Sequence, residues 1–243
     1  MQIEFKNLIK RFGDRTILKG LSFKIDSGKI LFILGTSGTG KSVLLKNLVG
    51  LLRPDEGEIF LDTKEISKIS EDEYLDIRKK VGMVFQQPAL FDSLTVYENV
   101  AFGLRRHFRF SEDVIQEKVK KSLALVNLSG VENKMPSQIS YGMQKRVSIA
   151  RTIALEPQVL LFDEPTTGLD PITTTAVNQL IFDLSRKLGT TSVVVSHDMT
   201  CALNIADQII VLDKGQIVDA GTPTELKKSQ VQLTKDFLSE VLE

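Results

Sequence analysis

The 243-residue sequence predicts an α/β fold with a parallel sheet at its core, an antiparallel β segment at one edge and an inserted lobe of helices. Short apolar runs alternate with longer stretches of helical periodicity through most of the chain, which is typical of strands that feed helices. Two regions depart from this alternation: residues 1–27 are extended, and residues from about 88 to 154 carry helical patterns alone. The length is sufficient for one large domain.

The parallel sheet is predicted from apolar runs that lack the polar alternation of a half-exposed strand. A parallel strand that is covered by helices on both faces is apolar along its whole length. The runs that meet this description are Ile30–Leu34, Val81–Val84, Val159–Phe162, Ser192–Val195 and Gln208–Leu212.

The edge segment and the helical lobe are predicted from the regions that break the pattern. Residues 1–27 form two extended segments around the turn Phe12-Gly13-Asp14-Arg15, which indicates antiparallel pairing. Helical patterns cover Val96–Leu104, Asp113–Val126 and Tyr141–Ala154. We therefore expect one domain over residues 1–243, with a core of residues 1–87 and 155–243 and a helical subdomain over about 88–154.

Two further helices are predicted towards the C-terminus. Residues Gln230–Glu243 form an amphipathic pattern that predicts a last helix. Beyond Pro171, apolar side chains recur at helical spacing and should face the sheet, namely Ala176, Val177, Leu180, Ile181 and Leu184.

Composition excludes several classes of protein. Lys and Arg total 31, as do Asp and Glu, so the whole chain carries no field that attracts nucleic acid. The single cysteine, Cys201, excludes an internal disulfide and a multi-cysteine zinc site, and it favours a reducing compartment. No apolar run reaches the roughly 18–20 residues of a membrane span, and the N-terminus lacks the pattern of a signal peptide.

The first chemical motif is Gly35-Thr36-Ser37-Gly38-Thr39-Gly40-Lys41-Ser42, which matches the P-loop pattern of nucleotide-binding proteins. It follows a predicted strand and opens a predicted helix, as a P-loop requires. Glycines allow the loop to turn its backbone N–H groups towards phosphate oxygens, and the helix N-terminus adds its dipole. Lys41 would bridge the β- and γ-phosphates, and the Ser42 hydroxyl would bind Mg²⁺.

The second motif is a predicted buried strand that ends in two adjacent acids, Asp163 and Glu164. Burying carboxylates is costly unless a cation is present, so packing alone does not account for this ending. Asp163 would hold the Mg²⁺ shell, and Glu164 would polarise a water in line with the γ-phosphate. By itself the pair also fits a solvent-exposed turn.

The third motif is Ile139-Ser140-Tyr141-Gly142-Met143-Gln144-Lys145-Arg146-Val147. Ser140 is placed to cap the following helix, whose free N–H groups and dipole would attract a phosphate; a plain helix cap is the alternative. The segment resembles the LSGGQ signature of ABC ATPases. On these three motifs the chain resembles the ATP-hydrolysing subunit of an ABC transporter, with a RecA-like P-loop NTPase core.

The resemblance extends along essentially the whole chain and implies roles for further residues. Phe12 would stack on adenine, although an aromatic residue in a core or turn is the alternative. Gln86 would sense the γ-phosphate and Mg²⁺, Asp170 would link two nucleotide sites, and His197 would hold the γ-phosphate. Ser140 and Gly142 would bind the nucleotide of a second copy in a head-to-tail dimer.

The same resemblance implies partners and a location. An ABC ATPase of this kind would work on an integral membrane permease, from the cytoplasmic face of the inner (plasma) membrane, with ATP and Mg²⁺. The groove between core and helical lobe, including Pro88–Glu98, is the expected contact with the permease. No nucleic-acid partner is expected.

Two details resemble the ATPases of Mla/Mce-type phospholipid transporters: the segment Ser37–Lys46 and Met143, which replaces the usual Gln of the signature. A lipid-binding Mce-type protein would then be a further partner. Tyr141 replaces a usual Gly and adds bulk where the partner's nucleotide approaches. The alternatives are drift within the family, an amino-acid importer, a cell-division type complex, a non-transport ABC ATPase and a P-loop kinase.

Overall fold

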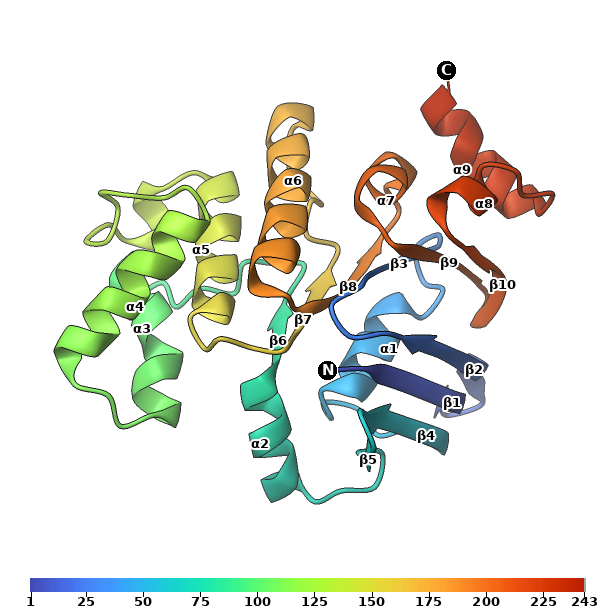
Figure 1. Cartoon of the computed structure of the whole chain (residues 1–243), viewed down its shortest axis with the longest axis horizontal. Helices are drawn as coiled ribbons and strands as arrows, with labels where there is room; N and C mark the ends of the chain where they lie inside the picture. Colours follow the sequence, from blue (N-terminus) through green and yellow to red (C-terminus); the bar gives the residue numbers. More distant parts are fainter. Residues whose placement is uncertain (243) are drawn as a thin grey trace.

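The computed structural model describes the backbone of residues 1–242 and the side chains of residues 1–239. Its larger sheet has the strand order β10-β9-β3-β8-β7-β6 (Figure 1). The β10–β9 pair is antiparallel and the other pairs are parallel, which confirms the predicted parallel core. The strands are β3 (Ile30–Leu34), β6 (Val81–Val84), β7 (Val159–Asp163), β8 (Thr191–Ser196), β9 (Gln208–Asp213) and β10 (Gln216–Gly221).

The smaller sheet is antiparallel, with the order β2-β1-β4-β5. The predicted hairpin is present, and Gly13 takes the left-handed backbone conformation at its turn (φ 55°). The two strands that complete this sheet were not predicted, because they are short and rich in Glu. Its members are β1 (Ile3–Phe12), β2 (Arg15–Ile25), β4 (Glu56–Leu61) and β5 (Lys64–Glu65).

Strand alternation in β3 divides the apolar interior into two cores. Ile30, Phe32 and Leu34 lie in a core shared with the C-terminal helices and the helical lobe. Leu31 and Ile33 lie in the other core, where α1 (Lys41–Leu48) packs between the two sheets. Successive side chains of a strand point to opposite faces, so both faces of β3 are buried and its continuous apolar sequence is explained.

The helical lobe is inserted between β6 and β7 and lies at one end of the molecule (Figure 1, green to yellow). Its helices confirm the predicted helical segments to within three residues. The domain boundaries at residues 87/88 and 154/155 stay a prediction. The helices are α3 (Val96–His107), α4 (Glu112–Leu125), a 3₁₀ turn (Pro136–Gln138) and α5 (Tyr141–Ile153).

The C-terminal helices are α6 (Pro171–Leu188), α7 (Met199–Ile205), α8 (Pro223–Leu226) and α9 (Gln232–Leu242). On α6, Val177, Leu180, Ile181 and Leu184 are buried as predicted. The prediction for Ala176 was wrong: its side chain is exposed, because it lies beside the buried stripe and not within it. The last helix confirms the amphipathic tail, and Glu243 lies outside the described residues.

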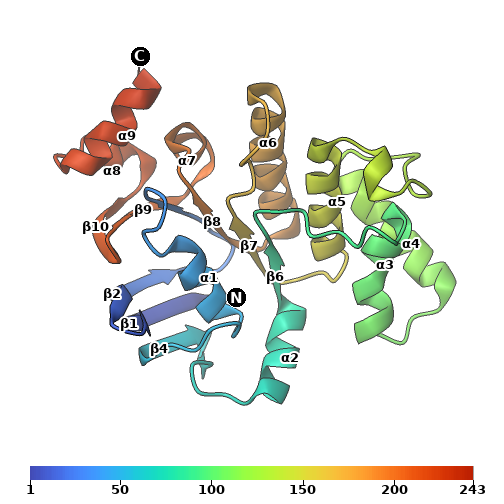
Figure 2. The ribbon, with the colours of Figure 1, turned by 180° about the vertical axis from the view of Figure 1, so that it is seen from behind.

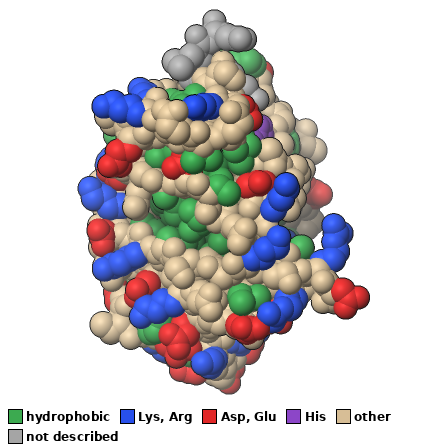
Figure 3. Space-filling view, turned by 90° about the vertical axis from the view of Figure 1, so that its right-hand side faces the viewer, with side chains coloured by type: hydrophobic (Ala, Val, Ile, Leu, Met, Phe, Trp, Pro, Cys, Tyr) green, Lys and Arg blue, Asp and Glu red, His purple; other side chains and the backbone are tan. Residues whose placement is uncertain are grey.

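Charged side chains of both signs are interspersed on the face seen from the side of α8, α9 and β10 (Figure 3). Hydrophobic side chains gather in the centre of that face and Lys, Arg, Asp and Glu surround them. This distribution agrees with the equal totals of basic and acidic residues in the sequence.

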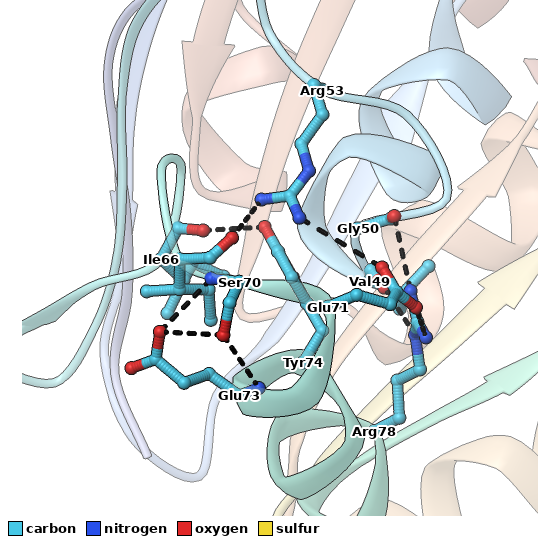
Figure 4. Close-up of polar contacts among 10 residues, drawn as sticks. Val49, Gly50, Arg53, Ile66, Ser70, Glu71, Glu73, Tyr74 and Arg78 are labelled. Carbon is cyan, nitrogen blue, oxygen red and sulfur yellow. Dashed lines mark hydrogen bonds and ion pairs between the residues drawn. The ribbon is translucent and has the colours of Figure 1, made fainter.

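Helix α2 (Glu71–Lys80) is hydrogen-bonded to the C-terminal end of α1 (Figure 4). This helix was not predicted from the sequence. The buried Tyr74 donates its hydroxyl to the Ile66 carbonyl at 2.6 Å. The Arg78 Nε donates to the Val49 carbonyl at 3.0 Å, which satisfies a backbone acceptor at the C-terminal end of α1. A Cβ at Gly50 would meet the Tyr74 ring at 2.5 Å, so only glycine fits there. These contacts fix the far end of the helix that begins at the P-loop.

Candidate active site

The predicted motifs meet at the carboxyl edge of the larger sheet. Strands β3, β7 and β8 run parallel in register, with Leu34 beside Ser196 and Asp163 beside Val195. The next strand, β6, pairs with β7 through Val84 and ends two residues before Gln86. Because parallel strands end at the same edge, the residues that follow them lie close together, and ligands bind at this edge in α/β sheets.

A cavity of about 400 Å³ opens at this edge. It brings together predicted residues from four segments of the chain: Phe12, Ser37–Ser42, Gln86 and Glu164. Phe12 is the last residue of β1, and its side chain is 47% exposed, so a core role is excluded for this ring. Ile17 and Val43 also line the cavity. Neither residue was predicted, because an apolar residue in a strand or helix carries no sequence signal of ligand contact.

The P-loop wraps around the Lys41 side chain, which is buried. The Lys41 Nζ donates to the Gly35 carbonyl at 2.6 Å and to the Thr36 carbonyl at 3.1 Å. Gly38 and Gly40 take left-handed conformations (φ 80° and 104°), which other residues rarely adopt. A Cβ on Gly35 would lie 2.5 Å from the Leu212 carbonyl oxygen. The glycines therefore allow the loop to curl at this position.

Ser42, which lines the cavity, is hydrogen-bonded to the buried Asp163 at the end of β7. The Ser42 hydroxyl donates to the Asp163 Oδ1 at 2.7 Å. Burial raises the pKa of Asp163 above its ordinary value, and the Ser42 hydrogen bond and the Lys46 and Lys41 cations oppose that rise. A buried carboxylate beside a hydroxyl fits a Mg²⁺ ion, which prefers oxygen ligands and completes its shell with phosphate oxygens and water. Within residues 1–239 no group of three or more His, Cys, Asp or Glu side chains offers another metal site.

Glu164 is held from three sides. Its Oε1 lies 3.3 Å from the Lys41 Nζ, and its Oε2 lies 2.9 Å from the His197 Nδ1. The Thr167 hydroxyl donates to the same Oε2 at 3.3 Å. Its backbone is left-handed (φ 46°), a conformation that costs about 1–3 kcal/mol in a residue other than glycine. Such strain is often found at active sites, where a side chain must be aimed.

Ser140, Gly142 and Asp170 do not line this cavity. The Ser140 hydroxyl accepts from the Met143 N–H at 3.3 Å and caps α5, as predicted. Asp170 caps α6 by accepting from the Thr173 N–H at 3.0 Å. A Cβ on Gly142 would lie 2.9 Å from the Thr173 methyl group, so the signature and Asp170 adjoin. Figures 1 and 2 both place α5 away from α1, with α6 between them.

His197 joins these two regions. It contacts Glu164 at the first cavity and lines a second cavity of about 370 Å³ together with Thr166–Leu169 and Met199. The site residues of the sequence analysis therefore lie in two groups, one around the P-loop and one around the starts of α5 and α6.

Comparison with known proteins identifies the family. The sequence profile described as ABC transporter matches residues 18–167. The chain belongs to the ABC transporter family. It is an ATPase subunit of such a transporter, and the fold predicted from the motifs is confirmed.

Two curated relatives are similar over nearly the whole chain. The intermembrane phospholipid transport system ATP-binding protein MlaF of Haemophilus influenzae is 42% identical over 236 residues, which cover 97% of this chain and 89% of that protein. The probable ribonucleotide transport ATP-binding protein mkl of Mycobacterium bovis is 40% identical over 239 residues, covering 98% and 67%. The predicted resemblance to ATPases of the Mla type is thus confirmed.

Among solved structures, a dimeric post-hydrolysis state of the ATP-binding cassette MJ0796 bound to ADP and phosphate is 34% identical, with a TM-score of 0.84. The match covers 91% of this chain and 98% of that one. No helix within residues 1–242 is long and apolar enough to cross a membrane.

Proposed function

We propose that this chain hydrolyses ATP with Mg²⁺ as a head-to-tail dimer on an integral membrane permease and so powers phospholipid transport. The observation that carries the choice of phospholipid is the 42% identity to MlaF over 97% of the chain. Met143 in the signature agrees with it. The location would be peripheral, on the cytoplasmic face of the inner membrane, and a lipid-binding Mce-type protein would be a further partner.

The first cavity would supply the parts needed to cleave a γ-phosphate. The P-loop amides and Lys41 would hold the phosphates, and Phe12 would stack on the adenine. Mg²⁺, held by Ser42 and Asp163 with Gln86 nearby, would neutralise charge on the β- and γ-phosphates. Glu164 would accept a proton from the attacking water. His197, which contacts Glu164, would orient the Glu164 carboxylate and hold the γ-phosphate.

A second copy of the chain would complete the site. Ser140 and Gly142 lie at the N-terminus of α5, which is an anion-binding position, yet they are absent from the cavity that contains the P-loop. In a head-to-tail dimer each α5 would face the nucleotide of the other subunit, and Asp170 beside it would link the two sites. Cleaving ATP would remove that shared contact and let the dimer open.

The permease would dock on the segment after Gln86. Phe91 and Phe102 are 42% and 47% exposed, and their ring centroids lie 4.7 Å apart. Glu98 is a poor probe of docking, because its carboxylate accepts from the Thr95 N–H and hydroxyl and caps α3. A change of Phe91 to Asp should weaken docking while nucleotide affinity stays the same.

The substrate assignment is tested by purifying the chain with its membrane partners in mild detergent and analysing the extracted lipids by mass spectrometry. We expect a multi-span permease and bound phospholipid in the complex, and ATPase activity that phospholipid stimulates. The competing candidate is ribonucleotide, from the similarity to mkl. A complex that carries no phospholipid and responds to a nucleotide, an amino acid or a sugar would refute the lipid assignment.

A further inference from the structure

Lys145, on the signature helix α5, is a lysine whose side chain is almost completely buried (1% exposed). Its Nζ donates a hydrogen bond to the backbone carbonyl of Gln86, a residue 59 positions earlier in the chain. Lysine is almost never fully buried without a partner, since removing an ammonium from water is costly. A charge-assisted hydrogen bond in a dry environment is correspondingly strong.

Tyr141 lies one helical turn before Lys145 and contacts the same segment. Its hydroxyl donates to the Gln87 Oε1 at 3.1 Å. The Lys145 Nζ lies 5.5 Å from the centroid of the Tyr141 ring, within the range of a cation–π contact. The ring also borders Gly168, where an added Cβ would lie 3.4 Å away. The side chain of Tyr141, which departs from the family pattern, therefore packs against residues of its own subunit.

The surroundings of Lys145 also connect it electrostatically to the acid pair. Burial lowers the pKa of Lys145, and the carboxylates of Asp163 and Glu164 oppose this. Its ammonium group is thus hydrogen-bonded to the backbone of Gln86 and is also attracted by the carboxylates at the end of β7.

We propose that Lys145 is a positioning residue: with Tyr141 it fixes the backbone of Gln86 and Gln87 to helix α5. The proposal rests on the proposed roles of Gln86 and of the signature. Gln86 lines the nucleotide cavity of its own subunit, whereas α5 begins with Ser140, which would face the partner's nucleotide. A rigid link between them would make the position of Gln86 depend on whether the partner's site is closed.

The test compares Lys145→Met and Tyr141→Phe with a matched control, Lys118→Met. Methionine keeps most of the length of lysine and removes the buried charge; Phe keeps the ring and removes the hydroxyl. Lys118 also joins two segments, through Glu156 at 2.8 Å, and its ion pair involves neither Gln86 nor Gln87. Turnover with MgATP, nucleotide Kd and thermal unfolding are measured for each full-length protein.

We expect Lys145→Met to lower kcat by about tenfold or more while the nucleotide Kd is kept. The Tm should fall by roughly 2–8 °C, because the Gln86 carbonyl loses its buried donor. Tyr141→Phe should lower kcat by about two- to fivefold, and the effect should largely vanish in the Lys145→Met background, since the two side chains act on one segment. The Lys118→Met control should stay within about twofold of the wild type.

An unchanged kcat in Lys145→Met would overturn the proposal, as would a loss of kcat that follows a fall in Tm and in nucleotide affinity together. If Lys145→Met does not fold, the test rests on Tyr141→Phe, because deleting a hydroxyl leaves the packing of the ring in place. An unchanged kcat in Tyr141→Phe would then overturn the proposal. Only ATP hydrolysis by the wild type is needed here, so a failed lipid assignment would not be mistaken for failure of this inference.

Discussion

Changing Glu164 to Gln should leave ATP bound but almost unhydrolysed. Glutamine has the same shape, so contacts to Thr167 and the backbone position are kept, but an amide neither takes up a proton nor polarises water as a carboxylate does. The change also removes the ion pair between Glu164 and Lys41, whose atoms lie 3.3 Å apart in a nearly buried site. Lys41 keeps its two bonds to the P-loop carbonyls and remains in place for the phosphates.

The size of the effect follows from these contacts. A positioned general base contributes roughly 10²–10⁴-fold to rate, so kcat should fall by about 10²–10³-fold. Nucleotide Kd should change by no more than about fivefold, because the substitution removes both the attraction of the Glu164 carboxylate for Lys41 and its repulsion of the phosphates, and these two effects oppose each other. The left-handed backbone at Glu164 costs the same in both proteins, so stability should stay within about 1 kcal/mol.

Phosphate release with MgATP measures turnover, and size exclusion with ATP and Mg²⁺ tests whether uncleaved nucleotide traps a dimer. The matched control is Glu156→Gln. Glu156 also has a left-handed backbone (φ 54°) and an ion pair, with Lys118, but it is exposed and outside the cavity. Near-wild-type turnover in both variants would refute the role of Glu164 as the base. Loss of ATP binding in Glu164→Gln alone would place Glu164 in nucleotide binding and not in hydrolysis.

Three further predictions concern other parts of the site. Ser140→Ala should spare ATP binding to the monomer but impair hydrolysis. Mixed with Lys41→Ala subunits, it should form heterodimers that recover activity, because both defects then fall in one composite site and the other site is intact. A confirmed heterodimer without hydrolysis would contradict independent composite sites. Asp163→Asn should lower kcat by on the order of 100-fold, yet raise the Tm at neutral pH. Burial raises the pKa of Asp163, so the wild type loses stability as the pH rises from the ordinary carboxyl pKa through the raised value. The difference in Tm between Asp163→Asn and the wild type should therefore shrink on acidification, and a difference that did not shrink would contradict this. Gly40→Ala should weaken nucleotide binding, since φ is 104° and the new methyl group would meet Leu18 at 2.7 Å; an unchanged nucleotide Kd would refute the need for glycine there.

Much of the fold could be predicted from the sequence, because its signals are local. A strand buried on both faces, such as Ile30–Leu34, is apolar at every position, and an amphipathic helix shows its period within a few turns. The P-loop is equally local, since one turn needs its glycines, its lysine and its serine in a fixed order. Together with the resemblance of residues 139–147 to the LSGGQ signature, these features indicate an ATPase of the ABC type before any contact between distant segments is known.

Contacts between distant segments were decided only by the tertiary structure. The short strand β4 carries no strong pattern of its own and is completed by its pairing with β1. Helix α2 has a local start signal in the capping box of Ser70 and Glu73, but only Tyr74 and Ile77 are buried, so it lacks the apolar period by which the other helices were predicted. The sequence showed Tyr141 as a departure from the family and gave no role to Lys145. Their place against residues 86–87 depends on how an inserted lobe packs on the core, because burial and hydrogen bonding over such separations are properties of the assembled chain and not of any local pattern.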